Sequence, residues 1–327
     1  MDQPKPHATS GRPRILVVDR FTHGEASESI RNALEARMEP VLLWEIPDLP
    51  SFLADEGATI RVLQTRSGTK IDTALLDGLP NLEIIVQVGA GLDQTPVAYA
   101  RARGIPVTHT PGVLTDDVAD IAMGLLIGAA RRLAEGDRYV RSGQWPAKGR
   151  FPLARKVSGK TCGIVAMGRI GRAVARRAAG FDMQILYHGP RRHADLGYEY
   201  CPDLEAMAQR SDFLVMCCPG GPETDKLVDE RVLRALSPKG IVVNVGRGST
   251  LDEAALEALL AEGALGGAGL DVYADEPHPR PALLAMENVF LLPHVGSGTE
   301  DTRQDMHRLC LDNLFAHLDG KPLITPA

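Results

Sequence analysis

The chain has 327 residues, a hydrophobic content of 44% and a formal net charge of −6 at pH 7. This length favours two domains, while the ordinary hydrophobic content and modest charge exclude a disordered chain and a surface that binds nucleic acid or another polyanion. Five cysteines without a Cys-x-x-Cys pair argue against a disulfide scaffold and a zinc site, so we expect no metal and a cytoplasmic protein.

Short apolar runs alternate with helical or turn-rich segments along the first third of the chain. Residues 1–13 come before them; they are polar and contain proline, so we expect a disordered tail there and no signal peptide. No apolar stretch is long enough to span a bilayer. The alternation is typical of a parallel sheet with crossover helices. The expected strands are Ile15–Val18, Ile60–Leu63, Ile84–Val88 and Pro106–His109.

A long helix and an irregular arm are predicted next. Apolar residues recur on one helical face from Leu114 to Leu133, which predicts an amphipathic helix. The stretch Arg138–Lys160 is rich in glycine, proline and arginine, and it includes Trp145 and Phe151. Exposed aromatic side chains in such an arm indicate an interface.

A second alternating block begins at Thr161 and predicts a nearly complete doubly wound unit. The expected fold class is therefore α/β, with two doubly wound parallel-sheet domains of the Rossmann or flavodoxin type. The strands expected in the second block are Cys162–Val165, Gln184–Tyr187, Phe213–Met216, Ile241–Val243, Ala268–Leu270 and Val289–Leu292.

A glycine motif follows the first strand of this block. Residues 166–171 read Ala-Met-Gly-Arg-Ile-Gly and precede a predicted helix, Arg172–Ala179. In a dinucleotide-binding motif the second glycine lets the pyrophosphate approach, and the third allows the helix to pack closely on the strand. Gly168 and Gly171 take these positions. Ala166 replaces the first glycine, and it would be strained if the turn needs a positive φ.

The end of the next predicted strand bears on the choice of cofactor. An NAD-specific site usually carries Asp or Glu near position 188, where it holds the ribose 2′-hydroxyl. His188 stands there instead, and the next acid is Asp195. Arg191 and Arg192 can pair with a 2′-phosphate, although they can also be solvated loop charges. We therefore expect NADP(H) to be preferred, with NAD(H) as the alternative.

Three polar residues each follow a short apolar run in the last third of the chain: Arg247, Glu276 and His294. Ligands and catalytic groups collect beyond the carboxyl ends of strands in an open α/β sheet. A guanidinium can bind a carboxylate through two parallel hydrogen bonds. A histidine beside a carboxylate can exchange a proton with a reacting oxygen. Together the three chemistries suit a 2-oxo or 2-hydroxy acid.

From about Val86 to the C-terminus the chain resembles the D-isomer-specific 2-hydroxyacid dehydrogenase family. The unbroken stretches 113–120 and 294–299 look most similar to its hydroxypyruvate, glyoxylate and hydroxyphenylpyruvate reductase branch. The motifs that carry the resemblance are Val-Gly-Ala-Gly-Leu-Asp at 88–93, Thr-Pro-Gly-Val-Leu-Thr-Asp-Asp at 110–117, Gly-Arg-Ile-Gly at 168–171, Asn-Val-Gly-Arg-Gly at 244–248, Gly-Leu-Asp-Val at 269–272 with Glu276 and Pro277, and Leu-Pro-His-Val-Gly-Ser-Gly at 292–298.

The resemblance implies the reduction of a small 2-oxo acid to a D-2-hydroxy acid in a cleft between two domains. His294, kept protonated by Glu276, would act as the acid, and Arg247 would anchor the substrate. The implied substrate contacts are Val88, Gly89, Ala90, Arg247, His294 and Trp145. The implied cofactor contacts are Met167, Gly168, Arg169, Ile170, Gly171, His188, Gly189, Pro190, Arg191, Cys218, Pro219, Val245, Gly246, Asp271 and Gly296.

The resemblance also implies a domain division and an assembly. Residues 1–108 and 298–327 would form a split substrate domain, to which a helix near Asp301–Leu318 returns. Residues 109–297 would form the dinucleotide-binding domain. Family members are typically dimers, which implies a homodimer through residues 110–160, with Trp145 reaching the partner's active site.

Other functions on the same scaffold remain open at this point. A formate-type dehydrogenase lacks the pairing of glutamate with histidine, so Glu276 argues against it; a phosphonate dehydrogenase is a further possibility. A nucleotide-sensing corepressor of the same family keeps all three polar residues, so the motifs do not exclude it. An NAD-dependent dehydrogenase of another 2-hydroxy acid is also an alternative.

Overall fold

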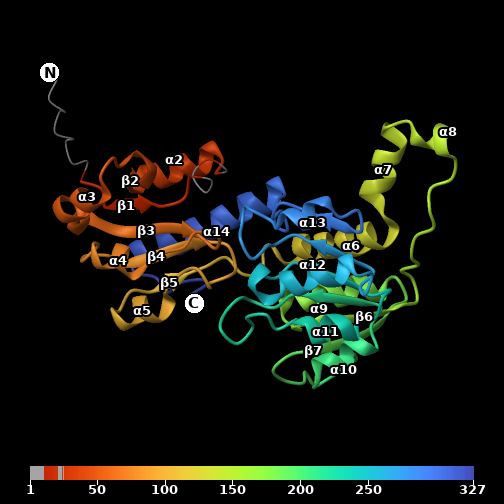
Figure 1. Ribbon diagram of the computed structural model, residues 1–327. Coiled ribbons are helices and arrows are strands. Elements are labelled where there is room, and N and C mark those ends of the chain that lie inside the picture. The colour runs from red at the N-terminus through yellow and green to blue at the C-terminus, as the bar shows by residue number, and fades with distance from the viewer. Residues whose placement is uncertain (1–10, 21–23, 25) are drawn as a thin grey trace. The chain divides into compact units, whose positions relative to one another are not determined.

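The computed structural model describes residues 11–20, 24 and 26–327, so most of the tail predicted at residues 1–13 lies outside the described part. The described residues form two compact α/β units (Figure 1). Unit 1 comprises the residues up to Leu114 together with Thr299–Ala327, and unit 2 comprises Thr115–Gly298. The first boundary lies six residues beyond the predicted 108, because residues 109 and 110 remain bonded within unit 1. The Thr110 amide donates to the Gly89 carbonyl oxygen at 2.9 Å, and the His109 amide donates to that of Thr325 at 3.2 Å.

Unit 1 contains a five-stranded sheet in the order β2-β1-β3-β4-β5, with every neighbouring pair parallel. The C-terminal helix α14 packs against β4. The strands are β1 Arg14–Val17, β2 Glu39–Leu42, β3 Ile60–Arg66, β4 Ile84–Val88 and β5 Val107–Thr108; the α-helices are α2 Glu28–Arg37, α3 Leu49–Asp55, α4 Thr73–Asp77, α5 Val97–Ala102 and α14 Glu300–Leu318; the 3-10 helices are η1 Leu43–Glu45 and η2 Gly57–Thr59.

Unit 2 contains a seven-stranded sheet in the order β12-β11-β10-β9-β6-β7-β8, again parallel throughout. Both sheets confirm the predicted α/β class. The strands are β6 Thr161–Val165, β7 Gln184–His188, β8 Glu199–Tyr200, β9 Phe213–Met216, β10 Ile241–Asn244, β11 Gly267–Leu270 and β12 Val289–Leu291; the helices are α6 Thr115–Arg131, α7 Leu133–Arg141, α8 Gln144–Lys148, α9 Arg169–Ala179, α10 Leu204–Gln209, α11 Glu230–Ala235, η3 Gly248–Thr250, α12 Glu253–Ala261 and α13 Pro281–Ala285.

Burial explains why the inner strands are so apolar. All four residues of β9 and of β10 are buried, as expected where helices cover both faces of a parallel sheet. Three helices of unit 2, α10, α11 and α12, begin after an aspartate whose carboxylate accepts a backbone amide of the first turn; these are Asp203, Asp229 and Asp252. Among the described helices, none is both long enough and apolar enough to cross a membrane.

Two short helices fall within the predicted irregular arm, which corrects the prediction for residues 138–141 and 144–148, whereas residues 149–160 are irregular as predicted. Helix α6 ends at Arg131, and α7 and α8 follow and project from the rest of unit 2 (Figure 1). Arg132 makes the bend with a positive φ of 54°, so the predicted end at Leu133 is two residues late. Phe151 is not exposed as expected, because its ring packs edge-on against Tyr139 at 5.3 Å. Trp145 is 60% exposed.

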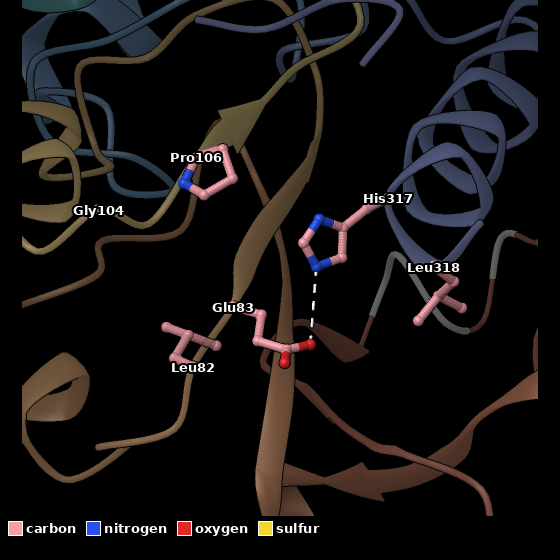
Figure 2. Close-up of a pocket in the computed structure, with 6 residues that line it drawn as sticks. All are labelled: Leu82, Glu83, Gly104, Pro106, His317 and Leu318. Carbon is pink, nitrogen blue, oxygen red and sulfur yellow. Dashed lines mark ion pairs between the residues drawn. The ribbon is translucent and has the colours of Figure 1, made fainter. Parts of the chain in front are cut away.

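Unit 1 has an open hollow of about 570 Å³, shown in Figure 2. His317, near the end of α14, faces Glu83 there, with Nε2 3.6 Å from a carboxylate oxygen. Leu82 and Glu83 precede β4, and Pro106 precedes β5, so the hollow lies at the amino ends of these strands. Ligands of open α/β sheets collect at the opposite, carboxyl ends. Within unit 1, this hollow therefore lies at the opposite end of β4 from Val88, the last residue of that strand.

Candidate active site

Arg247, Glu276 and His294 come together because they follow three neighbouring parallel strands. Arg247 lies three residues beyond β10, Glu276 lies beyond β11, and His294 lies beyond β12. These strands are adjacent in the sheet, in the order β12-β11-β10. Their carboxyl ends meet at one edge of the sheet, where the sequence placed the candidate site.

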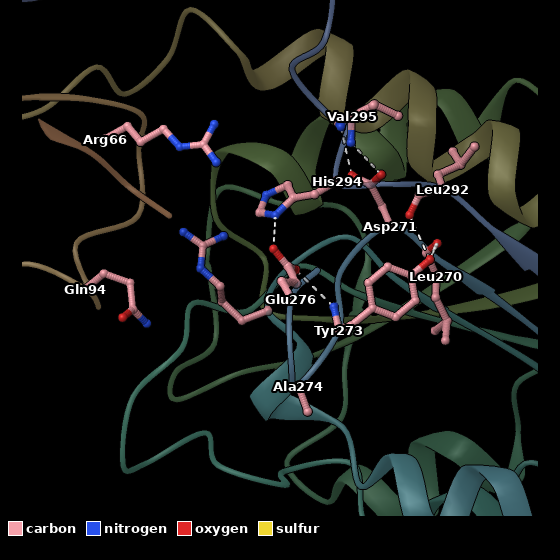
Figure 3. Close-up of polar contacts among 12 residues, drawn as sticks. Arg66, Gln94, Leu270, Asp271, Tyr273, Ala274, Glu276, Leu292, His294 and Val295 are labelled. Carbon is pink, nitrogen blue, oxygen red and sulfur yellow. Dashed lines mark hydrogen bonds and ion pairs between the residues drawn. The ribbon is translucent and has the colours of Figure 1, made fainter. Parts of the chain in front are cut away.

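His294 and Glu276 form a direct hydrogen-bonded pair. The His294 Nδ1 lies 2.6 Å from Glu276 Oε2, and Figure 3 shows the two side chains pointing toward each other. The imidazole is 41% exposed and the carboxylate 33% exposed. Within the described part of the chain, Nε2 of this ring has no hydrogen-bond partner. A ring held in this way through Nδ1 presents Nε2 to a reacting group.

The Glu276 carboxylate is held in its charged form. Its second oxygen, Oε1, accepts the Tyr273 amide at 3.0 Å. Burial by itself would raise the pKa of Glu276, but the hydrogen bond and charge of His294, the Tyr273 amide and the charge of Arg247 outweigh it. The pKa of this carboxyl therefore lies below its ordinary value. An ionised carboxylate at this position can accept a hydrogen bond from Nδ1 of the neighbouring imidazole.

Two further groups fix the segment that carries His294. Asp271, 1% exposed, accepts the amide of Val295 at 2.7 Å (Figure 3). It also accepts the amide of Gly296 at 2.8 Å. The Tyr273 hydroxyl donates to the Leu292 carbonyl oxygen at 2.7 Å. The backbone of His294 has a φ of 54°, which a residue other than glycine rarely adopts unless its neighbours hold it. Burial raises the pKa of Asp271, against the two amides and the charge of His294.

The backbone around Arg247 is equally constrained. Its carbonyl oxygen accepts the Asn244 side-chain amide at 2.9 Å and the Thr250 hydroxyl at 2.7 Å. A Cβ atom added to Gly248 would overlap the Tyr273 carbonyl and the Ala274 nitrogen. The strand end that carries Arg247 therefore lies directly against the loop that leads to Glu276, and only glycine fits at position 248.

The glycine turn has the shape that a dinucleotide needs. Ala166 has a φ of 73°, so the condition for strain at this alanine is met. Met167 is buried in the turn, and Gly168 caps helix α9, which begins with Arg169 and Ile170. The predicted start at Arg172 is thus three residues late.

The remaining space around the turn tests whether a cofactor fits. A Cβ at Gly168 would meet nothing within 4 Å, which leaves the helix N-terminus open to a pyrophosphate. A Cβ at Gly171 would overlap the Ala166 carbonyl oxygen, as close packing of helix on strand requires. Both glycines have the surroundings that the motif predicts, and the turn fits a dinucleotide.

The end of β7 carries the residues that bear on cofactor preference. His188 ends the strand, and its Nδ1 lies 3.0 Å from the Cys201 carbonyl oxygen. Gly189 and Pro190 lead to Arg191 and Arg192, which are exposed and have no ion-pair partner among the described residues. Asp195, the first acid after the strand, is paired with Arg172. The one carboxylate between residues 188 and 195, that of Asp195, is therefore already in an ion pair.

The other residues implied as cofactor contacts follow neighbouring strands of the same sheet. Cys218 and Pro219 follow β9, and Val245 and Gly246 follow β10. A Cβ at Gly246 would overlap the Cys218 carbonyl oxygen, so these two segments touch. Burial raises the pKa of the Cys218 thiol, which argues against a nucleophilic cysteine there. Asp271 and Gly296, beyond β11 and β12, complete the edge.

The candidate substrate residues of unit 1 lie at the carboxyl end of β4. Val88 is the last residue of that strand, followed by Gly89 and Ala90. The Gly89 amide already donates to Thr110 Oγ1 at 2.8 Å, which the sequence did not indicate and which argues against this amide as a substrate donor. The Ala90 amide has no partner among the described residues. The role of Tyr273 was not predicted because nothing in its spacing distinguishes it from an ordinary loop residue, and the motif at 110–117 did not indicate that Thr110 binds Gly89.

Comparison with known proteins assigns the chain to a family. Residues 123–296 match the family model described as D-isomer specific 2-hydroxyacid dehydrogenase, NAD binding domain. Glyoxylate/hydroxypyruvate reductase A of Arabidopsis thaliana is 45% identical over 300 residues, which cover 92% of this chain and 96% of the relative. Hydroxyphenylpyruvate reductase of Plectranthus scutellarioides gives the same identity and coverage. The chain belongs to the D-isomer specific 2-hydroxyacid dehydrogenase family.

Solved structures agree with this assignment. An NADPH-dependent glyoxylate/hydroxypyruvate reductase from Sinorhizobium meliloti, in complex with NADP and malonate, has a TM-score of 0.90 and 41% identity, with 97% of each chain covered. A 2-hydroxyacid dehydrogenase from Ketogulonicigenium vulgare has a TM-score of 0.89 and 39% identity over 97% of this chain and 98% of that one. The protein is thus an oxidoreductase whose unit 2 contains the family's NAD-binding domain.

Proposed function

We propose that the protein is an NADP(H)-preferring reductase that converts a small 2-oxo acid, of the glyoxylate or hydroxypyruvate class, into a D-2-hydroxy acid. The observation that carries the proposal is the hydrogen-bonded pair of His294 and Glu276, at 2.6 Å, beside the strand end of Arg247. The similar plant proteins are named as reductases of glyoxylate, hydroxypyruvate and hydroxyphenylpyruvate, which supports this substrate class.

In this proposal each polar residue has one task. The Arg247 guanidinium binds the substrate carboxylate, and the Ala90 amide from the Val88–Ala90 loop contributes a further hydrogen bond. The turn of Gly168 and Gly171 would hold NADPH, which would supply the hydride for the reduction. His294 donates the proton on Nε2 to the carbonyl oxygen. Glu276 orients the ring through Nδ1 and stabilises its charged form before the proton is given up.

The proposed NADP(H) preference depends on the loop after β7. Arg191 and Arg192 are available to a 2′-phosphate, while Asp195 is occupied by Arg172. The Sinorhizobium meliloti reductase was crystallised with NADP, which supports the same preference. The alternative, an NAD-dependent dehydrogenase of another 2-hydroxy acid, predicts a higher kcat/KM with NADH than with NADPH on one substrate.

The direct test is NADPH oxidation by the purified protein with glyoxylate, hydroxypyruvate, pyruvate and 4-hydroxyphenylpyruvate. We expect turnover with glyoxylate or hydroxypyruvate, and a D-configured product on a chiral column. A protein that binds NADPH but turns over none of the four acids would instead favour the corepressor-like alternative. The reductase names of its relatives argue for the enzyme.

We further propose a homodimer formed through residues 110–160. The support is that four apolar side chains between residues 133 and 153 are exposed, namely Leu133, Val140, Trp145 and Leu153, the last 98% exposed. Light scattering coupled to size exclusion should give twice the chain mass of 35.2 kDa. A monomer would contradict the proposed dimer. An unchanged KM for each acid in a Trp145→Ala variant would contradict the proposal that Trp145 reaches the partner's active site.

A cytoplasmic location is proposed from the five free cysteines.

A further inference from the structure

The short loop that carries Glu276 is held from outside the catalytic pair. It runs from Tyr273 to Glu276, beyond the end of β11. Its backbone packs against Gly248, where an added Cβ would overlap the Tyr273 carbonyl and the Ala274 nitrogen. The Tyr273 amide donates to Glu276, but the next amide, that of Ala274, points elsewhere.

The Ala274 amide donates to a buried carboxylate that no predicted role includes. Glu253 is the first residue of α12 and only 5% exposed, and its Oε1 accepts this amide at 2.7 Å. A charge is seldom buried without a partner, because removing it from water is costly. A hydrogen bond to this carboxylate fixes the plane of the Tyr273–Ala274 peptide, since that unit is rigid. This peptide, between Tyr273 and Ala274, is also the one that packs against Gly248.

The charges around Glu253 come from three segments. Burial raises the pKa of Glu253, the Ala274 amide and Arg280 lower it, and Glu276 with Asp275 raises it. Arg280, just before α13, is itself paired at 2.7 Å with Glu257, one turn further along α12. The remaining titratable groups nearby are Tyr273 in the loop and Asp252, the N-cap of α12.

We propose that Glu253 is a positioning residue for the acid–base pair. By holding the Ala274 amide it sets the turn in which the Tyr273 amide meets one oxygen of Glu276, so that the other oxygen meets His294 Nδ1. The inference rests on the proposed role of Glu276 and His294. Glu253 touches neither substrate nor cofactor in this proposal, and it acts only through Glu276.

The test compares three single variants by steady-state kinetics. Glu253→Ala removes the acceptor and should lower kcat about 10- to 100-fold, the scale on which a misplaced catalytic group reduces turnover. The KM for NADPH should stay unchanged. Glu253→Gln keeps an oxygen acceptor and should restore most of the activity. The matched control, Glu257→Ala, removes a carboxylate and an ion pair from the same helix without touching the loop, and should retain wild-type kcat.

A second measurement separates positioning from simple destabilisation. In a Glu276→Gln background, Glu253→Ala should cause no further loss of kcat, because its effect passes through Glu276. A purely structural role would lower the melting temperature and reduce kcat by the same factor in both backgrounds. Losses that multiply, or an unchanged kcat and pH profile in Glu253→Ala, would overturn the inference. Normal turnover in His294→Ala would instead overturn the proposed function, so the two failures are distinguishable.

Discussion

The two ends of the carboxyl edge in unit 2 are built differently. Beyond β10, β11 and β12 the loops are fixed by internal hydrogen bonds, as in the pair of His294 with Glu276 and in the two amides bound to Asp271. Beyond β7, Arg191 and Arg192 are exposed and have no ion pair among the described residues. Proton transfer needs a geometry set in advance, whereas a phosphate dianion can attract flexible cations. We therefore expect substitutions at the first end to reduce turnover and those at the second to change cofactor choice.

The largest effect should follow from replacing His294 with alanine. Loss of the general acid should lower kcat about 10²- to 10⁴-fold. NADPH binding, measured by the quenching of Trp fluorescence or the change in nicotinamide fluorescence, should be unchanged, because the turn around Gly168 is untouched. Near-normal turnover with intact cofactor binding would contradict the expectation that substitutions beyond β10, β11 and β12 reduce turnover.

Replacing Glu276 with glutamine tests the charge at the first end. Because the pKa of Glu276 lies below its ordinary value, the wild-type carboxylate stays charged as the pH falls through the usual glutamate range. The negative charge beside Nδ1 of His294 is thus present at every pH above that lowered pKa of Glu276. In Glu276→Gln we expect kcat for reduction to fall about 10²-fold, the lower end of the range for general acid catalysis, and the basic limb of the pH profile to move to lower pH. A profile identical to wild type would show that the charge plays no part.

Replacing Arg191 and Arg192 together by alanine tests the second end. A hydrogen bond to a charged group contributes about 1.5–3 kcal/mol, so kcat/KM with NADPH should fall roughly 10- to 100-fold. The value with NADH should change little. Arg231→Ala, which removes another exposed arginine, serves as the control. Equal losses with both cofactors would mean that these arginines do not read the 2′-phosphate.

The smallest effect should come from Ala166→Gly in the cofactor turn. A non-glycine residue at positive φ destabilises the folded protein by about 1–2 kcal/mol, and glycine removes this strain. Glycine also makes the unfolded chain more flexible, which lowers the free energy of unfolding by about 0.4–1 kcal/mol. Chemical denaturation should thus show a gain of roughly 0.5–1 kcal/mol in the free energy of unfolding. Ala179→Gly, in helix α9, should be destabilising instead. A less stable Ala166→Gly protein would show that the alanine is not strained at its φ of 73°.

Strands with two buried faces could be predicted because their sequences are apolar without interruption, as in Ile84–Val88. The edge strands β2 and β8 could not, although the edge strands β5 and β12 could. Glu39–Leu42 contains a glutamate and a proline, and Glu199–Tyr200 has only two residues. Helices α7 and α8 were missed because Gly136, Gly143 and Pro146 interrupt the helical pattern in the sequence.

The candidate site divides in the same way. His294, Glu276 and Arg247 could be predicted because each follows a strand within a recognisable motif. The bond between Glu253 and Ala274 could not, since it joins residues 21 positions apart through the packing of α12 on a loop. The bond from the Gly89 amide to Thr110 could not be predicted for a related reason, because Thr110 belongs to a different segment of unit 1.

The contact at Gly248 has a consequence for altering the substrate range. The backbone next to Arg247 and the loop of Glu276 share this point, where even a methyl group has no room. A library that varies the residues around Arg247 would therefore move Glu276, the partner of His294, as well as Arg247 itself. Beneficial substitutions on the two sides should depend strongly on each other, so they are best selected in combination rather than one at a time.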